Sequence, residues 1–396
     1  MGVGALSGLT PLYLGETVPA RIRGAIVSCY QLNIIFGIVI SYAITWGSSL
    51  KANDPSTSLS WRIPIAFQLL WGVVLIFFMF LIPESPRWLL MKGRETEARK
   101  IMAGMRAIEL QTDSSGQLRG DVSLEHDFVE MREGIALEQE AFAGTNWLTG
   151  FAVLFSPTQR MWYRTSLGIM LMFFQQVNGQ NFIYYFGPQV TSGLGLPIDS
   201  YALQFVFGIT SFIMTIPAIY LVEKIGRRPG LIFGAFSQAA CAFIIGFVGV
   251  HLLPEKGQTA PLTTQQHQAG NMFIAFAIIF LALFSMFWGP ICWIALSELF
   301  PGPLRARGIG LGSASNWFWN MMLGLFANKI AADIGFYIMV LFGAFDFCAG
   351  IFVTLFYPEL KGLTLEQVDD LFVEKIPAWR SAKWTAEKTK SKQVAV

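Results

Sequence analysis

Long apolar stretches, separated by short polar ones, dominate the pattern of this chain. A bilayer core about 30 Å thick takes roughly 20 apolar residues of helix, and several stretches reach that length. The first stretch is short and rich in glycine. The pattern predicts nine membrane-spanning helices, at 1–17, 25–46, 62–82, 163–188, 201–222, 230–251, 271–297, 308–330 and 336–357.

A polar segment at 84–160 interrupts this pattern between the third and fourth stretches. It contains mixed acidic and basic runs at 94–100 and 125–140. Such runs between apolar blocks are typical of short amphipathic helices at a water-facing surface.

Composition agrees with an all-α polytopic membrane protein. The chain is 54% hydrophobic and 14% charged, whereas a soluble domain carries about 25% charged residues. The net charge of +2 gives no reason to expect nucleic-acid binding. The four cysteines show no ligand-like spacing, and the three histidines, His126, His251 and His267, lie in connections. We therefore expect no metal, no cofactor and no enzymatic activity.

Lysine and arginine gather in alternate connections, which predicts the orientation of the chain. Basic residues follow the first, third, fifth, seventh and ninth stretches, whereas the intervening connections hold few. Because cytoplasmic loops carry the excess of basic residues, the C-terminus is predicted to be cytoplasmic. Nine spans would then place Met1 outside.

An internal repeat accompanies this unusual count. Glu16, Pro19 and Arg23 have the spacing E-x-x-P-x-x-x-R, and 298–305 repeats it. Two spans later, Pro83-Glu84 and Pro358-Glu359 each close a helix. Because transporters are often built from repeats, we expect a bundle of six plus six helices that lacks its first three. Chance similarity of short motifs is the alternative.

Five motifs, in order along the chain, resemble the sugar porter family of the major facilitator superfamily. They are Pro83-Glu-Ser-Pro-Arg87, Gln175-Gln-Val-Asn-Gly-Gln-Asn181, Glu223-Lys-Ile-Gly-Arg-Arg228, Gly289-Pro-Ile-Cys-Trp293 leading to Glu298, and Pro358-Glu-Leu-Lys-Gly362. The resemblance covers the chain to about Trp379 and implies family helices 4–12. It implies a partial N-terminal half-bundle at 1–83, a cytoplasmic linker at 84–160, a C-terminal six-helix half-bundle at 161–357 and a cytoplasmic tail at 358–396.

Amide side chains within the apolar stretches are the candidates for a binding site. A sugar is neutral and carries many hydroxyl groups, so amides that donate and accept suit it, with an aromatic face for the ring. The resemblance implies that sugar contacts Gln31, Gln175, Gln176, Asn181, Trp293 and Asn316, and Asn320 is a further candidate. On a continuous helix over 163–188 the amides would share one wide face. Amides that merely join helices are the alternative.

Charged residues at helix ends on the predicted cytoplasmic side form a second candidate group. Ion pairs among them would hold an inner gate shut and break during each transport cycle, whereas simple anchoring of the topology is the alternative. The group comprises Glu16, Arg23, Glu84, Arg87, Glu223, Arg227, Arg228, Glu298 and Arg305.

Asp346 lies near the middle of the ninth stretch with no evident cationic partner in the sequence. A carboxylate at the centre of a bilayer costs roughly 2.5–3.5 kcal/mol on insertion scales. It is a candidate proton site, and a protonated or hydrogen-bonded carboxyl group in a wet crevice is the alternative.

The sequence thus predicts transport of a hexose or pentose across a membrane by alternating access, either facilitative or coupled to protons as symport. A sensor that binds sugar without moving it and an inactive truncated product are the alternatives. The expected partners are a small-molecule sugar, protons and the lipid bilayer, with no nucleic acid. We expect a monomer in the plasma membrane.

Overall fold

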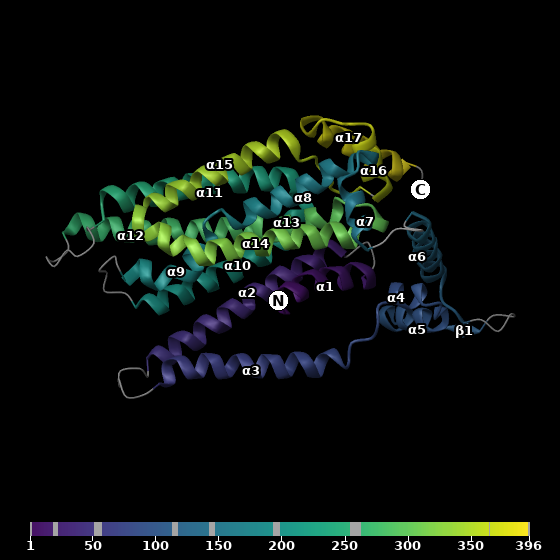
Figure 1. Cartoon of the computed structure of the whole chain (residues 1–396), viewed down its shortest axis with the longest axis horizontal. Helices are drawn as coiled ribbons and strands as arrows, with labels where there is room; N and C mark the ends of the chain where they lie inside the picture. The colour runs from purple at the N-terminus through teal and green to yellow at the C-terminus, as the bar shows by residue number, and fades with distance from the viewer. Residues whose placement is uncertain are drawn as a thin grey trace.

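The computed structural model is an elongated bundle of long helices (Figure 1). It describes residues 2–18, 23–50, 58–112, 118–141, 147–192, 199–253, 263–363 and 365–394. Each predicted span overlaps helix in the structure. The spans correspond to α1 (Gly2–Thr17), α2 (Arg23–Ser49), α3 (Leu59–Met79), α8 (Met161–Gln176) with α9 (Gln180–Ser192), α10 (Ser200–Ile225), α11 (Arg227–His251), α12 (Thr264–Leu283) with α13 (Gly289–Glu298), α14 (Gly302–Ile334) and α15 (Tyr337–Phe356).

Six of these elements are long and apolar enough, by length and composition, to cross a membrane within the described residues. They are 29–49 of α2, α3, α10, α11, the continuous run Thr264–Glu298, and α15. The apolar part of α1, Gly2–Leu14, is shorter than a span needs. Six of the predicted spans therefore meet the criteria of length and hydropathy within the described residues, and the count of nine stays a prediction.

The predicted helix over 163–188 is not continuous, which corrects the sequence-based interpretation. α8 ends at Gln176, and α9 begins at Gln180. Between them, Gly179 has a φ of +95°, a conformation that glycine adopts without steric cost. A Cβ atom there would lie 2.8 Å from the ring of Phe342. The break therefore requires glycine at this position, both for its backbone conformation and for the space beside α15.

A second irregularity lies between α12 and α13. Residues Phe284–Trp288 form a short π-helical turn, η3, and Pro290 follows it within the first turn of α13. Such π-turns inside long helices occur frequently at functional sites. Proline lacks the backbone N–H that a helix interior would use.

Two apolar cores lie within the group of helices from α8 to α15. One surrounds Trp288 and joins α8, α11, α13 and α15, and the other surrounds Phe207 and Phe280 between α9, α10 and α12. α11 and α15 approach each other closely, since a Cβ atom on Gly246 would lie 2.6 Å from Val340. Because glycine has no side chain, it lets the two helix backbones approach each other this closely.

The α1–α3 group contacts this core through two helices. α2 packs along α10, α1 packs against α14, and α3 packs against α2. None of the residues of α3 is buried, and α3 runs along one edge of the molecule in Figure 1.

The polar segment after α3 contains short helices and a small hairpin. It comprises α4 (Pro86–Met91), α5 (Glu95–Arg106), β1 (Gln111–Thr112) paired antiparallel with β2 (Leu118–Arg119), α6 (Val122–Ala141), α7 (Trp147–Ala152), η1 (Val153–Phe155) and η2 (Thr158–Arg160). Short helices are present in this segment, as expected, and the hairpin was not predicted. A small core of its own around Leu89, Met102, Leu124 and Phe128 holds α4, α5 and α6 together.

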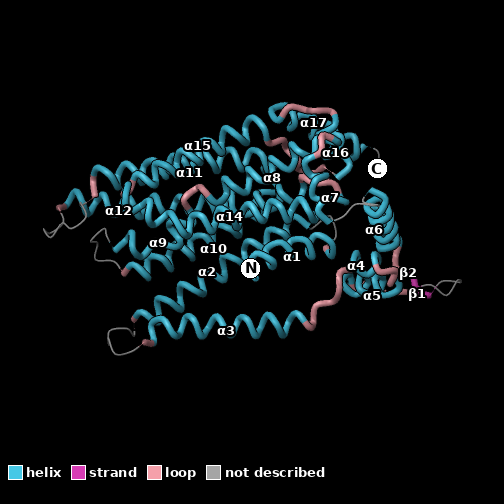
Figure 2. The backbone as a smooth tube through the Cα atoms, in the orientation of Figure 1, coloured by secondary structure: helices cyan, strands magenta, loops and turns pink. Residues whose placement is uncertain are grey.

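All the short polar helices lie at one end of the bundle. Figure 2 shows α4–α7 at the same end as α16 (Leu365–Val373) and α17 (Ala378–Val394). The described parts of 84–160 and of 365–394 thus lie at the same end of the molecule.

Candidate functional site

Five amide side chains from three helices join in one hydrogen-bonded network. Gln175 and Gln176 end α8, Asn181 is the second residue of α9, and Asn316 and Asn320 lie one turn apart on α14. Asn316 Nδ2 donates to Gln175 Oε1 at 2.7 Å, and Gln176 Nε2 donates to Asn316 Oδ1 at 2.8 Å. Gln176 Oε1 also accepts from Asn181 Nδ2, and from Asn320 Nδ2 at 3.1 Å. The structure therefore brings together five of the seven predicted binding residues.

The helix break creates this arrangement. The Gln175 amide donates to the backbone carbonyls of Trp288 and Gly289, both at 3.1 Å, so it fixes the end of α8 against the π-turn. With α8 ended at Gln176, Asn181 restarts the helix beside the Gln176 amide. The continuous helical face predicted for these residues is wrong, but the predicted grouping of Gln175, Gln176 and Asn181 is present.

The network runs from a buried end to an exposed end. Gln175 and Asn316 are each 3% exposed, and Gln176 and Asn320 are half-buried. Tyr185, which is 46% exposed, exchanges hydrogen bonds with Asn320 through its hydroxyl group. Each amide both donates and accepts, so a molecule with several hydroxyl groups can replace these mutual bonds from the exposed end.

Gln31 and Trp293 lie next to the network without a hydrogen bond to it among the described residues. Gln31 is buried on α2, and its Nε2 lies 3.3 Å from where a Cβ atom on Gly289 would stand. Trp293 packs edge-on against Tyr30, with ring centroids 5.9 Å apart. These two contacts bring α2 against α13 beside the amide network.

Several polar residues near the break were not predicted from the sequence. Asn178, within the break, accepts from the backbone N–H of Gln180 at 3.0 Å and donates to Gln238 Oε1 of α11 at 3.3 Å. The backbone carbonyl of Tyr184 accepts from Tyr42 of α2 and Gln204 of α10. Polar residues inside apolar stretches were the available signal, but their partners depend on tertiary contacts.

Asp346 is 3% exposed on α15, and its Oδ2 has no hydrogen-bond partner among the described residues. α15 packs along α11 at this point, since a Cβ atom on Gly343 would lie 3.3 Å from the carbonyl of Ala239. The buried carboxyl group thus belongs to the α11–α15 contact, whereas the amide network lies between α8, α9 and α14.

Arg227 is the centre of an ion-pair cluster at the polar end of the bundle. Its side chain is 5% exposed and forms two hydrogen bonds with each of two carboxylates, that of Glu298 at 2.8 and 3.1 Å and that of Glu223 at 3.2 and 3.3 Å. The cluster ties the start of α11 to the ends of α10 and α13. These described pairs join helices of the α8–α15 group to one another.

Glu359 completes this cluster, although it was not among the predicted charged residues. Its carboxylate accepts from the backbone N–H groups of Arg227 and Arg228, both at 3.1 Å, and so caps the start of α11. A negative charge at a helix N-terminus is favourable. Tyr357 is buried beside it, and burial, with the nearby carboxylates of Glu298 and Glu359, raises the pKa of its hydroxyl group.

The structure describes fewer contacts for the other predicted charged residues. The side chains of Glu16 and Arg23 lie outside the described residues. Glu84 is exposed, and Arg87 is half-buried. Arg228 donates to the carbonyl of Thr354 at 2.8 Å, and Arg305 donates to that of Ser297 at 2.9 Å. These two contacts also stay within the α8–α15 group.

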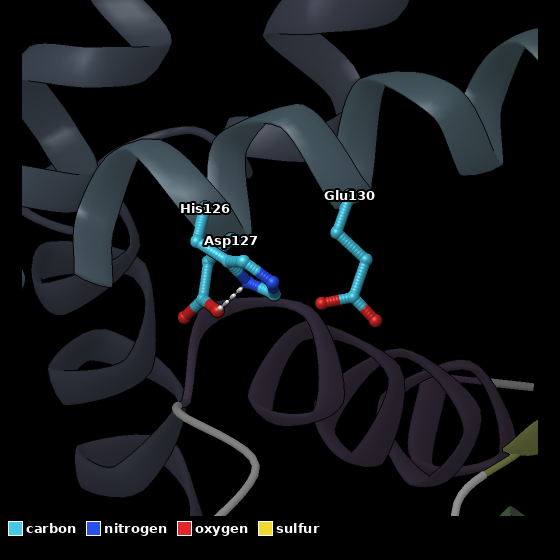
Figure 3. A group of neighbouring side chains, drawn as sticks. All are labelled: His126, Asp127 and Glu130. Atoms are coloured by element: carbon cyan, nitrogen blue, oxygen red, sulfur yellow. Dashed lines mark ion pairs between the residues drawn. The ribbon is translucent and has the colours of Figure 1, made fainter. Parts of the chain in front are cut away.

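A group of potential metal ligands lies on α6, away from the network. Figure 3 shows His126, Asp127 and Glu130 on one side of this helix. His126 and Glu130 are exposed, and Arg106 pairs with Asp127 at 2.6 Å. The ion pair supplies Asp127 with a cation from α5, so its carboxylate already serves to fasten α5 to α6.

Comparisons with known proteins identify relatives over almost the whole chain. The family described as sugar (and other) transporters matches residues 1–372. A high-affinity fructose transporter of Schizosaccharomyces pombe is 35% identical, over 99% of this chain and 69% of that protein. Hexose transporter 2 of Kluyveromyces lactis is 34% identical, over 97% of this chain and 64% of that protein. The chain thus spans about two thirds of the length of the curated relatives it matches.

Solved structures give the same result. The proton:xylose symporter XylE of the major facilitator superfamily, bound to 6-bromo-6-deoxy-D-glucose, superposes with a TM-score of 0.74 and 26% identity. That match covers 94% of this chain and 72% of the other. The inward-open conformation of XylE from E. coli gives a TM-score of 0.63 at 25% identity, over 92% of this chain and 69% of the other.

Proposed function

Because the chain belongs to the sugar transporter family of the major facilitator superfamily, we propose that it moves a monosaccharide across a membrane by alternating access. The substrate is a hexose or a pentose, since the names of similar proteins include fructose, hexose and xylose transporters. The sugar binds at the amide network and exchanges water and amide partners for its hydroxyl groups.

The convergence of five amides from α8, α9 and α14 carries this proposal. Amides that only joined helices would be satisfied inside a closed contact, whereas this network ends at the exposed hydroxyl group of Tyr185. Gln31 and Trp293 supply an amide and an aromatic face from the adjacent α2–α13 contact. Donors, acceptors and a ring face are the groups that a hydroxylated ring needs.

The finer features of the function are part of the same proposal. Proton coupling is included because the similar solved structures are titled a proton:xylose symporter. We place the protein in the plasma membrane as a monomer, with its C-terminus and linker in the cytoplasm, on the basis of the basic residues at that end.

Uptake measurements test the proposal directly. In a host without its own hexose carriers, we expect saturable uptake of labelled glucose, fructose or xylose, and weaker uptake by Asn181→Ala. Asn271→Ala is the matched control, since this asparagine is exposed on α12 and forms no hydrogen bond with the network among the described residues. Sugar binding to the purified chain separates failure to bind from failure to translocate. Absence of both for every monosaccharide would refute the proposal.

Two roles compete for Asp346: a proton carrier and a structural carboxyl group in the α11–α15 contact. An uncoupler first shows whether uptake depends on protons at all. The structural role predicts that Asp346→Asn, which preserves the shape of the side chain, retains uptake and its pH dependence. A flattened pH dependence with normal amounts of protein in the membrane would assign the proton to Asp346.

A further inference from the structure

The helix α17 is held beside the end of α15 by hydrogen bonds. α15 ends at Phe356, and Glu359 follows three residues later. The backbone N–H of Glu359 donates to Ser381 Oγ at 2.8 Å, and its carbonyl accepts from Thr385 Oγ1 at 3.0 Å. If α15 spans the bilayer, these two bonds hold α17 at the level of the lipid headgroups.

The exposed residues of α17 and of the turn before it include apolar and basic ones. Val373 is 56% exposed, and Trp379 is 62% exposed. Lys375, Arg380 and Lys383 are exposed around them. None of these three cations forms an ion pair with a carboxylate that the structure describes. We call these five residues the tail patch.

The sequence beyond the tail patch continues the same charge. Lys388, Lys390 and Lys392 follow within α17, and one acidic residue, Glu387, lies among the helix's residues. Their side chains lie outside the described residues, so only their positive charge supports membrane binding. A helix that combines an exposed tryptophan with many basic residues is typical of segments that lie in the plane of a membrane surface.

The tail patch continues a surface of α15 that is exposed and apolar. Leu355 and Phe356, in the last turn of α15, are each 46% exposed. In Figure 1, α15 and α17 follow the same outer edge of the bundle, with α16 toward the inside of α17. A bilayer that surrounds the end of α15 would therefore meet α17 next, at its headgroup layer.

We propose that the tail patch binds the surface of an anionic bilayer. Trp379 and Val373 enter the boundary between headgroups and acyl chains, and the three exposed cations pair with lipid phosphate and carboxylate groups. The inference rests on the proposed orientation of the chain, because anionic lipids are concentrated in the cytoplasmic leaflet. It assigns a function to a segment outside the sugar site.

Hydrogen–deuterium exchange of the full chain in nanodiscs tests this proposal. We expect the amides of 379–394 to exchange more slowly in discs of phosphatidylcholine with phosphatidylserine than in discs of phosphatidylcholine alone. Arg380→Glu with Lys383→Glu should remove the difference between the two kinds of disc. Each basic residue near the surface should account for about a fivefold slowing of exchange. High salt should weaken the protection in the unchanged protein.

Matched variants separate this surface from a general effect of charge. Lys92→Glu with Lys100→Glu makes the same change of charge on exposed residues of the linker helices and should leave the exchange of α17 unaltered. Arg380→Lys with Lys383→Arg should preserve the protection. Equal exchange in both kinds of disc, or protection that requires an added protein instead of lipid, would overturn the proposal.

The orientation is tested separately from the lipid contact. Nanodiscs present the same lipid on both faces, so the exchange result does not depend on which end of the bundle faces the cytoplasm. An epitope after Val396 should be inaccessible to antibody in intact cells. Accessibility from outside, together with lipid-dependent protection, would refute the orientation and leave the contact with anionic lipid standing.

Discussion

Asn316 has a central place among the residues of the network, because it connects both members of the Gln175–Gln176 pair. It donates to one amide and accepts from the other. Alanine at this position leaves a carbonyl oxygen and an amide N–H without their partners, and an unsatisfied buried polar group costs about 1–3 kcal/mol. The network would then hold its remaining members less firmly.

We therefore predict that Asn316→Ala weakens sugar binding about tenfold, since 1.4 kcal/mol corresponds to a factor of ten. Ser315→Ala is the control, because Ser315 also joins α14 to α8, through the carbonyl of Ile169, without touching the amides. The measurement is sugar affinity from competition for uptake or from binding to the purified chain. Equal affinity of Asn316→Ala and the unchanged protein would contradict the assignment.

At this scale the residue types were predictable, whereas their partners were not. Gln175, Gln176, Asn181, Asn316 and Asn320 stand out because amides are costly in lipid and must find partners or water. The contribution of Tyr185 to the exposed end could have been found from its spacing, since it lies four residues after Asn181 on α9. The bond from Asn178 to Gln238 depends on the position of the α8–α9 break beside α11, and no local pattern encodes it.

At the scale of elements, the break between α8 and α9 determines where the site forms. A strongly apolar stretch favours one continuous helix, and that expectation fails at Gly179 because its positive φ and the ring of Phe342 fix a turn. Glycine inside an apolar helix is also a common packing residue. The sequence therefore predicts that 163–188 is helical but does not reveal the break.

We predict that Gly179→Ala destabilises the protein by about 3 kcal/mol, since a strained backbone costs about 1–3 kcal/mol and the methyl group would also collide with Phe342. Gly37→Ala on α2 is the control, because nothing lies within 4 Å of its added Cβ atom. There alanine should be neutral or slightly stabilising. Thermal unfolding of the two purified variants in detergent provides the comparison, and similar melting temperatures would refute the role assigned to Gly179.

The ends of α10, α11 and α13 depend in the same way on Arg227. Loss of one member of a buried ion pair leaves an uncompensated charge and costs about 3 kcal/mol. Here the uncompensated charge is mainly the carboxylate of Glu298, because Glu223 is 47% exposed and an exposed pair contributes little. Arg227→Ala should therefore lower the melting temperature clearly, whereas Arg132→Ala, which removes an exposed pair with Glu95, should change it little.

The same variant tests whether the charge cluster acts in transport. Arg227→Ala should also reduce uptake if the cluster holds the polar end of the bundle closed during the cycle. Normal uptake, with normal amounts of protein at the cell surface, would leave the cluster as a purely structural tie. Arg227→Ala combined with Glu298→Gln should recover part of the stability, because it removes the unpaired carboxylate.

At the scale of the whole molecule, the α1–α3 group meets the α8–α15 group where α2 packs against α10 and α13 and where α1 packs against α14. α2 lies along α10, where Trp46 donates to Asp199 at the N-cap of α10, and Tyr42 of α2 donates to the carbonyl of Tyr184 on the neighbouring α9. α1 lies along α14, where Trp317 donates to Ser7 at 2.6 Å. The hydropathy pattern predicted the helices of both groups, but the choice of neighbours arises from complementary side chains that are far apart in sequence.

The α2–α10 contact allows a test of whether these groups move during transport. A Cβ atom on Gly208 would lie 3.4 Å from Val39 Cγ2, which brings cysteines at the two positions within reach of a disulfide. In a background without the four native cysteines, we predict that Val39→Cys with Gly208→Cys forms a cross-link under oxidant. Uptake should then stop, because alternating access requires one group to move against the other. Reductant should restore uptake, and uptake by each single-cysteine variant should be insensitive to oxidant.

Undiminished uptake by the fully cross-linked protein would show that α2 and α10 stay together throughout the cycle. The moving contact would then have to be sought between α1 and α14.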